Sequence, residues 1–160
     1  MLFLSSDITN KTIFSLESGE DIANISGMVV NPNNLKIEAF YVSSPFISYD
    51  AVVFTDDIRE SSLDGFVVDG MKNLVPLDSN LIRLQKIINL NFKIDELKVQ
   101  NTDGKNIGSI KEYIFSDSSF EITKIYVAEK SLKSKILDKV VTVKRSQIVK
   151  LSNQKIVVGA

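Results

Sequence analysis

The apolar residues of this chain fall into paired runs separated by polar turns. Asp21 to Val30 and Leu35 to Val42 are rich in Ile, Val, Phe and Tyr, and the segment 31–34 between them holds three Asn and one Pro. β-Branched and aromatic residues favour strands, whereas Asn and Pro favour turns. The pattern therefore predicts a β-hairpin. A second hairpin of the same form is predicted from Asn106 to Phe115 and Phe120 to Val127.

The alternation of apolar side chains changes phase within one strand of each hairpin. Leu35 and Ile37 share one face of the first hairpin, whereas Phe40 and Val42 share the opposite face. Side chains alternate strictly between the two faces of a regular strand. A β-bulge or a strongly coiled strand is therefore expected at this point in both hairpins.

The two hairpins belong to a longer internal repeat. Residues 19–45 align with residues 104–130 without a gap, and residues 51–69 align with residues 141–159. Identical pairs include Gly19 and Gly104, Ile37 and Ile122, Tyr41 and Tyr126, and Val68 and Val158. Two matches in the same order indicate a tandem duplication. We predict one module at residues 1–78 and a second at residues 79–160.

Each copy is predicted to contain five or six short strands. Besides the hairpins, apolar runs mark strands at 51–54 and 66–68 in the first copy, and at 140–143 and 156–158 in the second. Short strands with local connections are typical of a small barrel. The predicted fold class is mainly β, with two tandem small antiparallel β-barrels.

A short helix is predicted between the copies or at the end of each. Leu81, Leu84, Ile87 and Ile88 fall on one face at helical spacing, although the segment 81–90 also fits an extended strand. No Gly/Ser-rich linker separates the copies, so they are expected to pack together.

The amino-acid composition limits the kinds of catalytic and metal-binding site that the chain can form. The chain has no Cys and no His, which excludes disulfides, thiol nucleophiles, imidazole bases and the usual transition-metal sites. We therefore predict that the protein is not an enzyme and has no catalytic residues, no cofactor and no metal. Asp56, Asp57 and Glu60 offer oxygen ligands, but adjacent acids after a strand are typical of a solvated turn.

No apolar run approaches the roughly 20 residues that cross a bilayer, so membrane insertion is not expected. The segment Met1 to Leu4 lacks the basic start and the apolar length of a secretory signal. We expect a cytoplasmic protein.

The residues also resemble a known family. The run Gly104-Lys105-Asn106-Ile107-Gly108-Ser109-Ile110, the strand end Ile125-Tyr126-Val127, and the turns Ser146-Gln147-Ile148 and Asp56-Asp57-Ile58 are similar to a PRC-barrel domain, once per copy. The first copy departs from this pattern with Ala23 where the second has Gly108. The resemblance implies a small antiparallel β-barrel used as an assembly or adaptor module, and it implies no catalytic residues.

The copies differ most in charge. Residues 1–80 hold four Lys and Arg against 12 Asp and Glu, for a net charge of −8, whereas residues 81–160 hold 15 against eight, for +7. Glu20 is replaced by Lys105, Glu60 by Lys150 and Thr55 by Arg145 at equivalent positions. Apolar positions are kept while surface positions change sign, so the two copies are not expected to bind the same partner.

Three interpretations of this asymmetry remain open. The acidic copy complements the basic one internally, or the charges form an interface for another protein or a second copy of the chain. In the third, the basic stretch binds RNA phosphates. The candidate partner-binding residues are Lys130, Lys133, Lys135, Lys139, Lys144, Arg145 and Lys150. A single Arg, no interleaved aromatic residues and a sequence pI near 5.5 disfavour RNA.

The function expected from the sequence is a noncatalytic protein–protein interaction or scaffold module built from tandem PRC-barrel-like repeats. The partner is a protein of unknown identity, with a homo-oligomer as a further option. The alternative is an RNA- or ribosome-associated factor that uses the basic second module.

Overall fold

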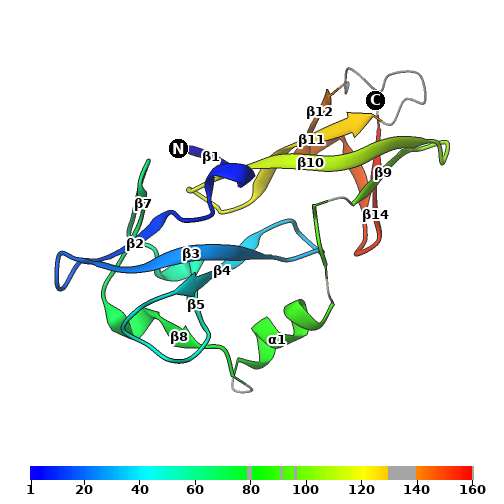
Figure 1. Ribbon diagram of the computed structural model, residues 1–160. Helices are drawn as coiled ribbons and strands as arrows, with labels where there is room; N and C mark the ends of the chain where they lie inside the picture. Colours follow the sequence, from blue (N-terminus) through cyan, green and yellow to red (C-terminus); the bar gives the residue numbers. More distant parts are fainter. Residues whose placement is uncertain (79–80, 91, 96, 130–139, 160) are drawn as a thin grey trace.

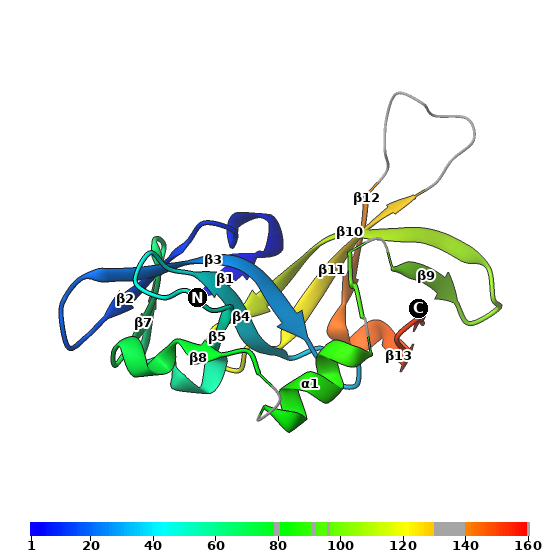
Figure 2. The ribbon, with the colours of Figure 1, turned by 60° about the horizontal axis from the view of Figure 1, so that its bottom comes forward.

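The computed structural model describes residues 1–78, 81–90, 92–95, 97–129 and 140–159. The chain is mainly β and forms two curled sheets, one from each copy, which lie side by side (Figures 1 and 2). The prediction of a mainly β fold is therefore confirmed.

The first sheet has the strand order β6-β7-β2-β3-β4-β5-β8. Its strands are β2 (Thr12–Ser15), β3 (Asp21–Val30), β4 (Ile37–Ser43), β5 (Ala51–Phe54), β6 (Glu60–Ser62), β7 (Gly65–Val68) and β8 (Val75–Pro76). Three short 3-10 helices lie in this copy: η1 (Ser5–Asp7), η2 (Thr55–Asp57) and η3 (Met71–Asn73).

The second sheet repeats this order as β13-β14-β9-β10-β11-β12. Its strands are β9 (Lys98–Asn101), β10 (Asn106–Ser116), β11 (Ile122–Glu129), β12 (Val140–Lys144), β13 (Ile148–Leu151) and β14 (Lys155–Val158), with the 3-10 helix η4 (Arg145–Gln147). The shared order supports the duplication inferred from the sequence. Closure of either sheet into a barrel is not among the described strand pairings and stays a prediction.

Each sheet contains one parallel pair, at the same place in both copies. β2 runs parallel to β7, and β9 runs parallel to β14, whereas the sequence predicted antiparallel barrels. These strands are separated along the chain by the rest of their sheet, so no tight turn forces them to run in opposite directions.

The predicted bulge is present in both hairpins. The β3–β4 register shifts so that Val29 faces Ala39 but Val30 faces Ile37, which leaves Glu38 as the extra residue. The β10–β11 register shifts at the equivalent point, where Thr123 is the extra residue. Ile37 and Phe40 therefore both reach the main core despite their odd spacing.

The tips of the two hairpins pair with each other. The Ile37 N–H donates to the Phe120 carbonyl at 2.8 Å, and the Ile122 N–H donates to the Leu35 carbonyl at 3.0 Å. These are equivalent positions in the two copies, so the contact is self-complementary in the manner of a two-fold dimer. Leu35 and Phe120 have φ values of 57° and 56°, which show that both copies use the same left-handed turn.

One core joins the copies. β1 (Leu2–Leu4), from the start of the first copy, pairs antiparallel with β10 of the second. The buried rings of Phe3, Phe40 and Phe66 contact those of Phe115 and Phe120, with centroids 5.4 to 6.4 Å apart. One large cluster contains buried side chains from both sheets. The copies are therefore packed against each other, as the absence of a flexible linker predicted.

The segment between the copies forms the helix α1 (Ile82–Asn89), so the helical interpretation is confirmed and the strand alternative is wrong. Leu84 and Ile87 are buried against Val29, Ala39 and Val52 in a second, smaller cluster. The helix thus lies against the first sheet, on the face opposite the main core (Figures 1 and 2). The predicted module boundary at residues 78 and 79 stays a prediction.

Candidate functional site

The candidate lysines and arginine divide into two groups. Lys130, Lys133, Lys135 and Lys139 lie outside the described residues. Lys144 ends β12, Arg145 begins η4 and Lys150 lies in β13, and all three side chains are exposed. Lys144 and Arg145 are thus adjacent where β12 passes into η4, and Lys150 follows in β13, which lies at the other edge of the strand order.

These cations form no ion pair within the part of the chain that the structure describes. Lys144, Arg145 and Lys150 make no ion pair there, whereas Lys36 pairs with Asp56 at 3.4 Å and Arg59 pairs with Asp69 at 2.9 Å in the first copy. The Arg59 guanidinium, through its hydrogen bond, lowers the pKa of Asp69. Ion pairs with the acidic first copy therefore do not account for the charge of Lys144, Arg145 and Lys150 in the described residues.

Two cross-strand pairs bring like charges together in the second sheet. Lys124 of β11 lies directly opposite Lys144 of β12, and Lys98 of β9 lies directly opposite Lys155 of β14. Like charges in directly opposed positions disfavour strand pairing. Sequence reasoning missed Lys124 as a site residue because its neighbour across the sheet is 20 positions away. The register, rather than a run of basic residues, adds it to the surface.

The equivalent positions in the first copy are apolar and covered. Ala39 stands where Lys124 does and Phe54 stands where Lys144 does, and they face each other in the same register. Both belong to the cluster that α1 covers, together with Tyr41. Burial raises the pKa of the Tyr41 phenol. The same outer face is therefore apolar and covered in one copy, and basic in the other.

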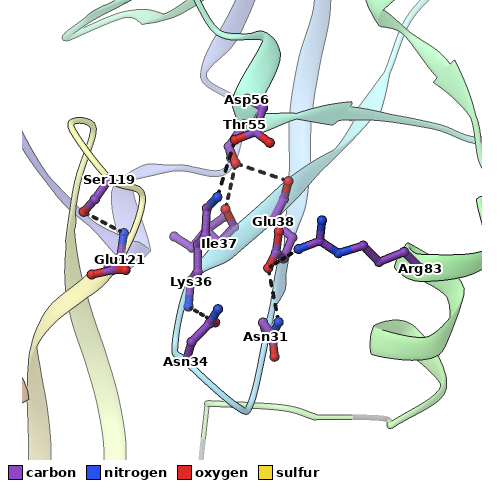
Figure 3. Close-up of polar contacts among 10 residues, drawn as sticks. All are labelled: Asn31, Asn34, Lys36, Ile37, Glu38, Thr55, Asp56, Arg83, Ser119 and Glu121. Carbon is purple, nitrogen blue, oxygen red and sulfur yellow. Dashed lines mark hydrogen bonds and ion pairs between the residues drawn. The ribbon is translucent and has the colours of Figure 1, made fainter.

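Polar contacts surround the bulge in the first copy, and one of them reaches α1 (Figure 3). The buried Thr55 hydroxyl donates to the carbonyls of Ile37 at 2.9 Å and Glu38 at 3.2 Å. The Glu38 carboxylate accepts a hydrogen bond from Asn31 at 3.1 Å and lies 4.0 Å from the Arg83 guanidinium of α1. In the second copy, Thr123 replaces Glu38 and the exposed Arg145 replaces the buried Thr55. The second copy thus lacks the acid that contacts the helix in the first copy, and it has an exposed cation where the first copy has a buried hydroxyl.

A groove of about 700 Å³ crosses the boundary between the copies. Equivalent segments of β3 and β10 form its two sides, and Phe92 to Asp95 contribute to its wall. The Tyr113 hydroxyl donates to the Met28 sulfur at 4.0 Å, and burial, with the nearby Asp95 carboxylate, raises the pKa of Tyr113. The sequence did not indicate this groove, because it depends on how the copies pack.

The described ranges also bear on metal binding and on membrane insertion. No group of three or more acidic, Cys or His side chains comes together there, and Asp56 is engaged by Lys36. None of the helices described in the structure has the length and apolar character needed to cross a membrane. Comparison with protein-family models and with curated proteins gave no match for this chain.

Proposed function

We propose that this protein is a noncatalytic interaction module that binds an acidic protein partner through its second copy. The binding surface would comprise Lys124, Lys144, Arg145 and Lys150, which we call the basic face. One observation carries the proposal. The cross-strand pair Ala39 and Phe54 is apolar and covered in the first copy. At the equivalent positions, the second copy has two lysines opposite each other: Lys124, which is half-buried, and Lys144, which is exposed.

The electrostatic argument favours an external anion. The Lys124–Lys144 pair costs the sheet stability in isolation, and a carboxylate placed between the two ammonium groups would remove that repulsion. Charge complementarity of this kind steers association and sets orientation. The resemblance to PRC-barrel domains, with their use as adaptors, points in the same direction, and a cytoplasmic location remains our expectation.

A protein partner fits the basic face better than RNA does. Single-stranded RNA binding relies on aromatic stacking platforms beside the cations. Tyr126 is half-buried on this face, and the basic face has one Arg. The first copy also carries a net charge of −8, counted over residues 1–80, which repels a polyanion. RNA association is the alternative that the experiment must separate.

Reversing three cations tests the proposal. The variant K144E/R145E/K150E is expected to lose at least tenfold in retention of its protein partner on affinity capture from source-cell extract. The loss follows because each attraction becomes a repulsion across the interface. Mass spectrometry and RNA sequencing of nuclease-treated and untreated captures provide the measurement.

The matched control reverses Lys72, Lys86 and Lys105, three exposed lysines on other parts of the chain, and so changes the net charge by a similar amount. This control should retain the partner. Equal loss from both variants would show a general charge effect and contradict the proposal. A capture that disappears with nuclease would instead support the RNA alternative.

A further inference from the structure

In the first copy, β8 covers the outer edge of the sheet and α1 covers its outer face. β8 pairs antiparallel with the outer edge of β5, where Ala51 faces Pro76 and Val52 faces Val75. The Leu77 N–H continues this contact by donating to the Asp50 carbonyl at 2.8 Å. After β8 the chain enters α1, which covers the outer face of the same sheet. A strand followed by a helix therefore occupies both the edge and the face.

The second copy presents the same two surfaces. β12 is the equivalent of β5 and pairs with β11 alone among the strands that the structure describes. Its first residue, Val140, is 48% exposed. The one α-helix in the described ranges lies on the first sheet, so no described helix covers the outer face of β10, β11 and β12. An edge strand with unpaired backbone groups is a template for another strand.

We propose that this edge and face bind an acidic strand–helix segment of a partner protein. Its strand would add to β12 beside Val141 and Thr142, and its amphipathic helix would lie over β10 and β11, as β8 and α1 do in the first copy. This inference rests on the proposed function and names the partner class and the binding mode. Strand addition and helix docking are both established modes of peptide recognition.

The charges define the chemistry of the helix. In the first copy, α1 is basic, with Arg83 and Lys86, and Arg83 meets the acidic Glu38. In the second copy, Thr123 stands where Glu38 does, and the next residue, Lys124, lies opposite Lys144 across the strands. A helix docked there must therefore carry Asp or Glu where α1 carries Arg and Lys, because like charges at the contact disfavour binding.

The surface also retains apolar area for such a helix. Ile114 stands at the position of Val29, and Tyr126 stands at the position of Tyr41; both are half-buried. Lysine side chains have long apolar stems that pack against hydrophobic groups while the ammonium remains at the rim. Ile114, Tyr126 and the stems of Lys124 and Lys144 can thus contact the apolar side of a helix while the charged ends meet its acids.

The chain itself supplies a test peptide. The acidic probe is a synthetic peptide of residues 74–90 in which Arg83 and Lys86 are both changed to Glu, and the basic probe is the unchanged peptide. NMR amide shifts and hydrogen exchange of the full chain are measured with each. We expect the acidic probe to bind at least tenfold more tightly, to slow exchange of β12 amides, and to shift the amides of Ile114, Tyr126 and Thr142.

Variants of the full chain test whether the acidic probe binds through Lys144. K144E is expected to weaken the acidic probe at least tenfold, whereas E60K, on the first sheet, should leave it unchanged. Equal affinity of the two probes, shifts confined to the first sheet, or no binding at millimolar peptide would overturn the inference. The last result would mean that the lysines only keep the edge of β12 from pairing with other chains.

Two further outcomes separate this inference from the proposed function. If K144E/R145E/K150E loses its protein partner but the acidic probe does not bind, the interaction function stands and the strand–helix mode fails. If the chain forms a concentration-dependent dimer that K144E abolishes, the occupant is the acidic copy of a second molecule, and the inference is overturned.

Discussion

Replacing Phe66 with alanine is expected to destabilise both copies together, by about 3–5 kcal/mol. Phe66 is fully buried in β7 of the first copy, and its ring lies 5.1 Å from that of Phe3 and 6.2 Å from that of Phe120. Phe120 belongs to the second copy, and Phe3 lies on β1, which pairs with the second sheet. The cavity would therefore be bordered by rings of both copies, with Phe40 of the first copy 5.0 Å away.

Urea unfolding followed by fluorine NMR of fluorotyrosine-labelled protein measures this effect. Tyr41 and Tyr49 report on the first copy, while Tyr113 and Tyr126 report on the second. All four signals should lose their native positions at one lowered midpoint. The control is Phe46→Ala, which removes the same side chain from a position that is 62% exposed and should change stability by roughly 0.5 kcal/mol or less. Separate midpoints for the two copies would contradict a shared core.

Changing Gly108 to alanine is expected to destabilise the protein by at least about 1–3 kcal/mol, the usual cost of a strained backbone conformation. Gly108 has φ of 158°, and an added Cβ would lie 2.0 Å from the carbonyl oxygen of Ala128 on the neighbouring strand. The strand pairing of β10 with β11 must shift to accept it. The equivalent residue in the first copy is Ala23, whose φ is not positive.

Gly104→Ala is the matched comparison for Gly108→Ala. Gly104 has φ of 81°, but an added Cβ would meet no atom within 4 Å, so this variant carries backbone strain without the clash. The loss of unfolding free energy in urea should therefore be larger for Gly108→Ala. If Gly108→Ala were as stable as the original chain, the geometry of β10 at this residue would be wrong.

The hairpins and the helix could be predicted because each is encoded by neighbouring residues. The phase change between Ile37 and Phe40 predicted a bulge or a strongly coiled strand, and the structure has a bulge at Glu38. The spacing of Leu84 and Ile87 predicted the buried side of α1. The pairing of Ile37 with Phe120, and of β1 with β10, could not be predicted. These contacts join residues far apart in the sequence, and no local pattern distinguishes an edge that meets the other copy from one that meets solvent.

The candidate site was predictable in its charge but not in its layout. The excess of lysine in residues 81–160 identified Lys144, Arg145 and Lys150, which lie in the consecutive elements β12, η4 and β13. Lys124 joins them only through the β11–β12 register, and the contrast with Ala39 and Phe54 depends on knowing where α1 packs. The four lysines between 130 and 139 lie outside the described residues, so their part in the site stays a prediction.

Photo-crosslinking from the two equivalent tyrosines tests the central claim most directly. Benzoylphenylalanine would replace Tyr126, on the basic outer face, or Tyr41, which packs in the cluster covered by α1. In source-cell extract, benzoylphenylalanine at position 41 should crosslink to α1 of its own chain, which would show that the crosslinking reaction works in this protein. Position 126 should join to a partner peptide that is rich in Asp and Glu and has helical apolar spacing. Adducts to RNA, or no intermolecular adduct while position 41 reacts, would contradict the account.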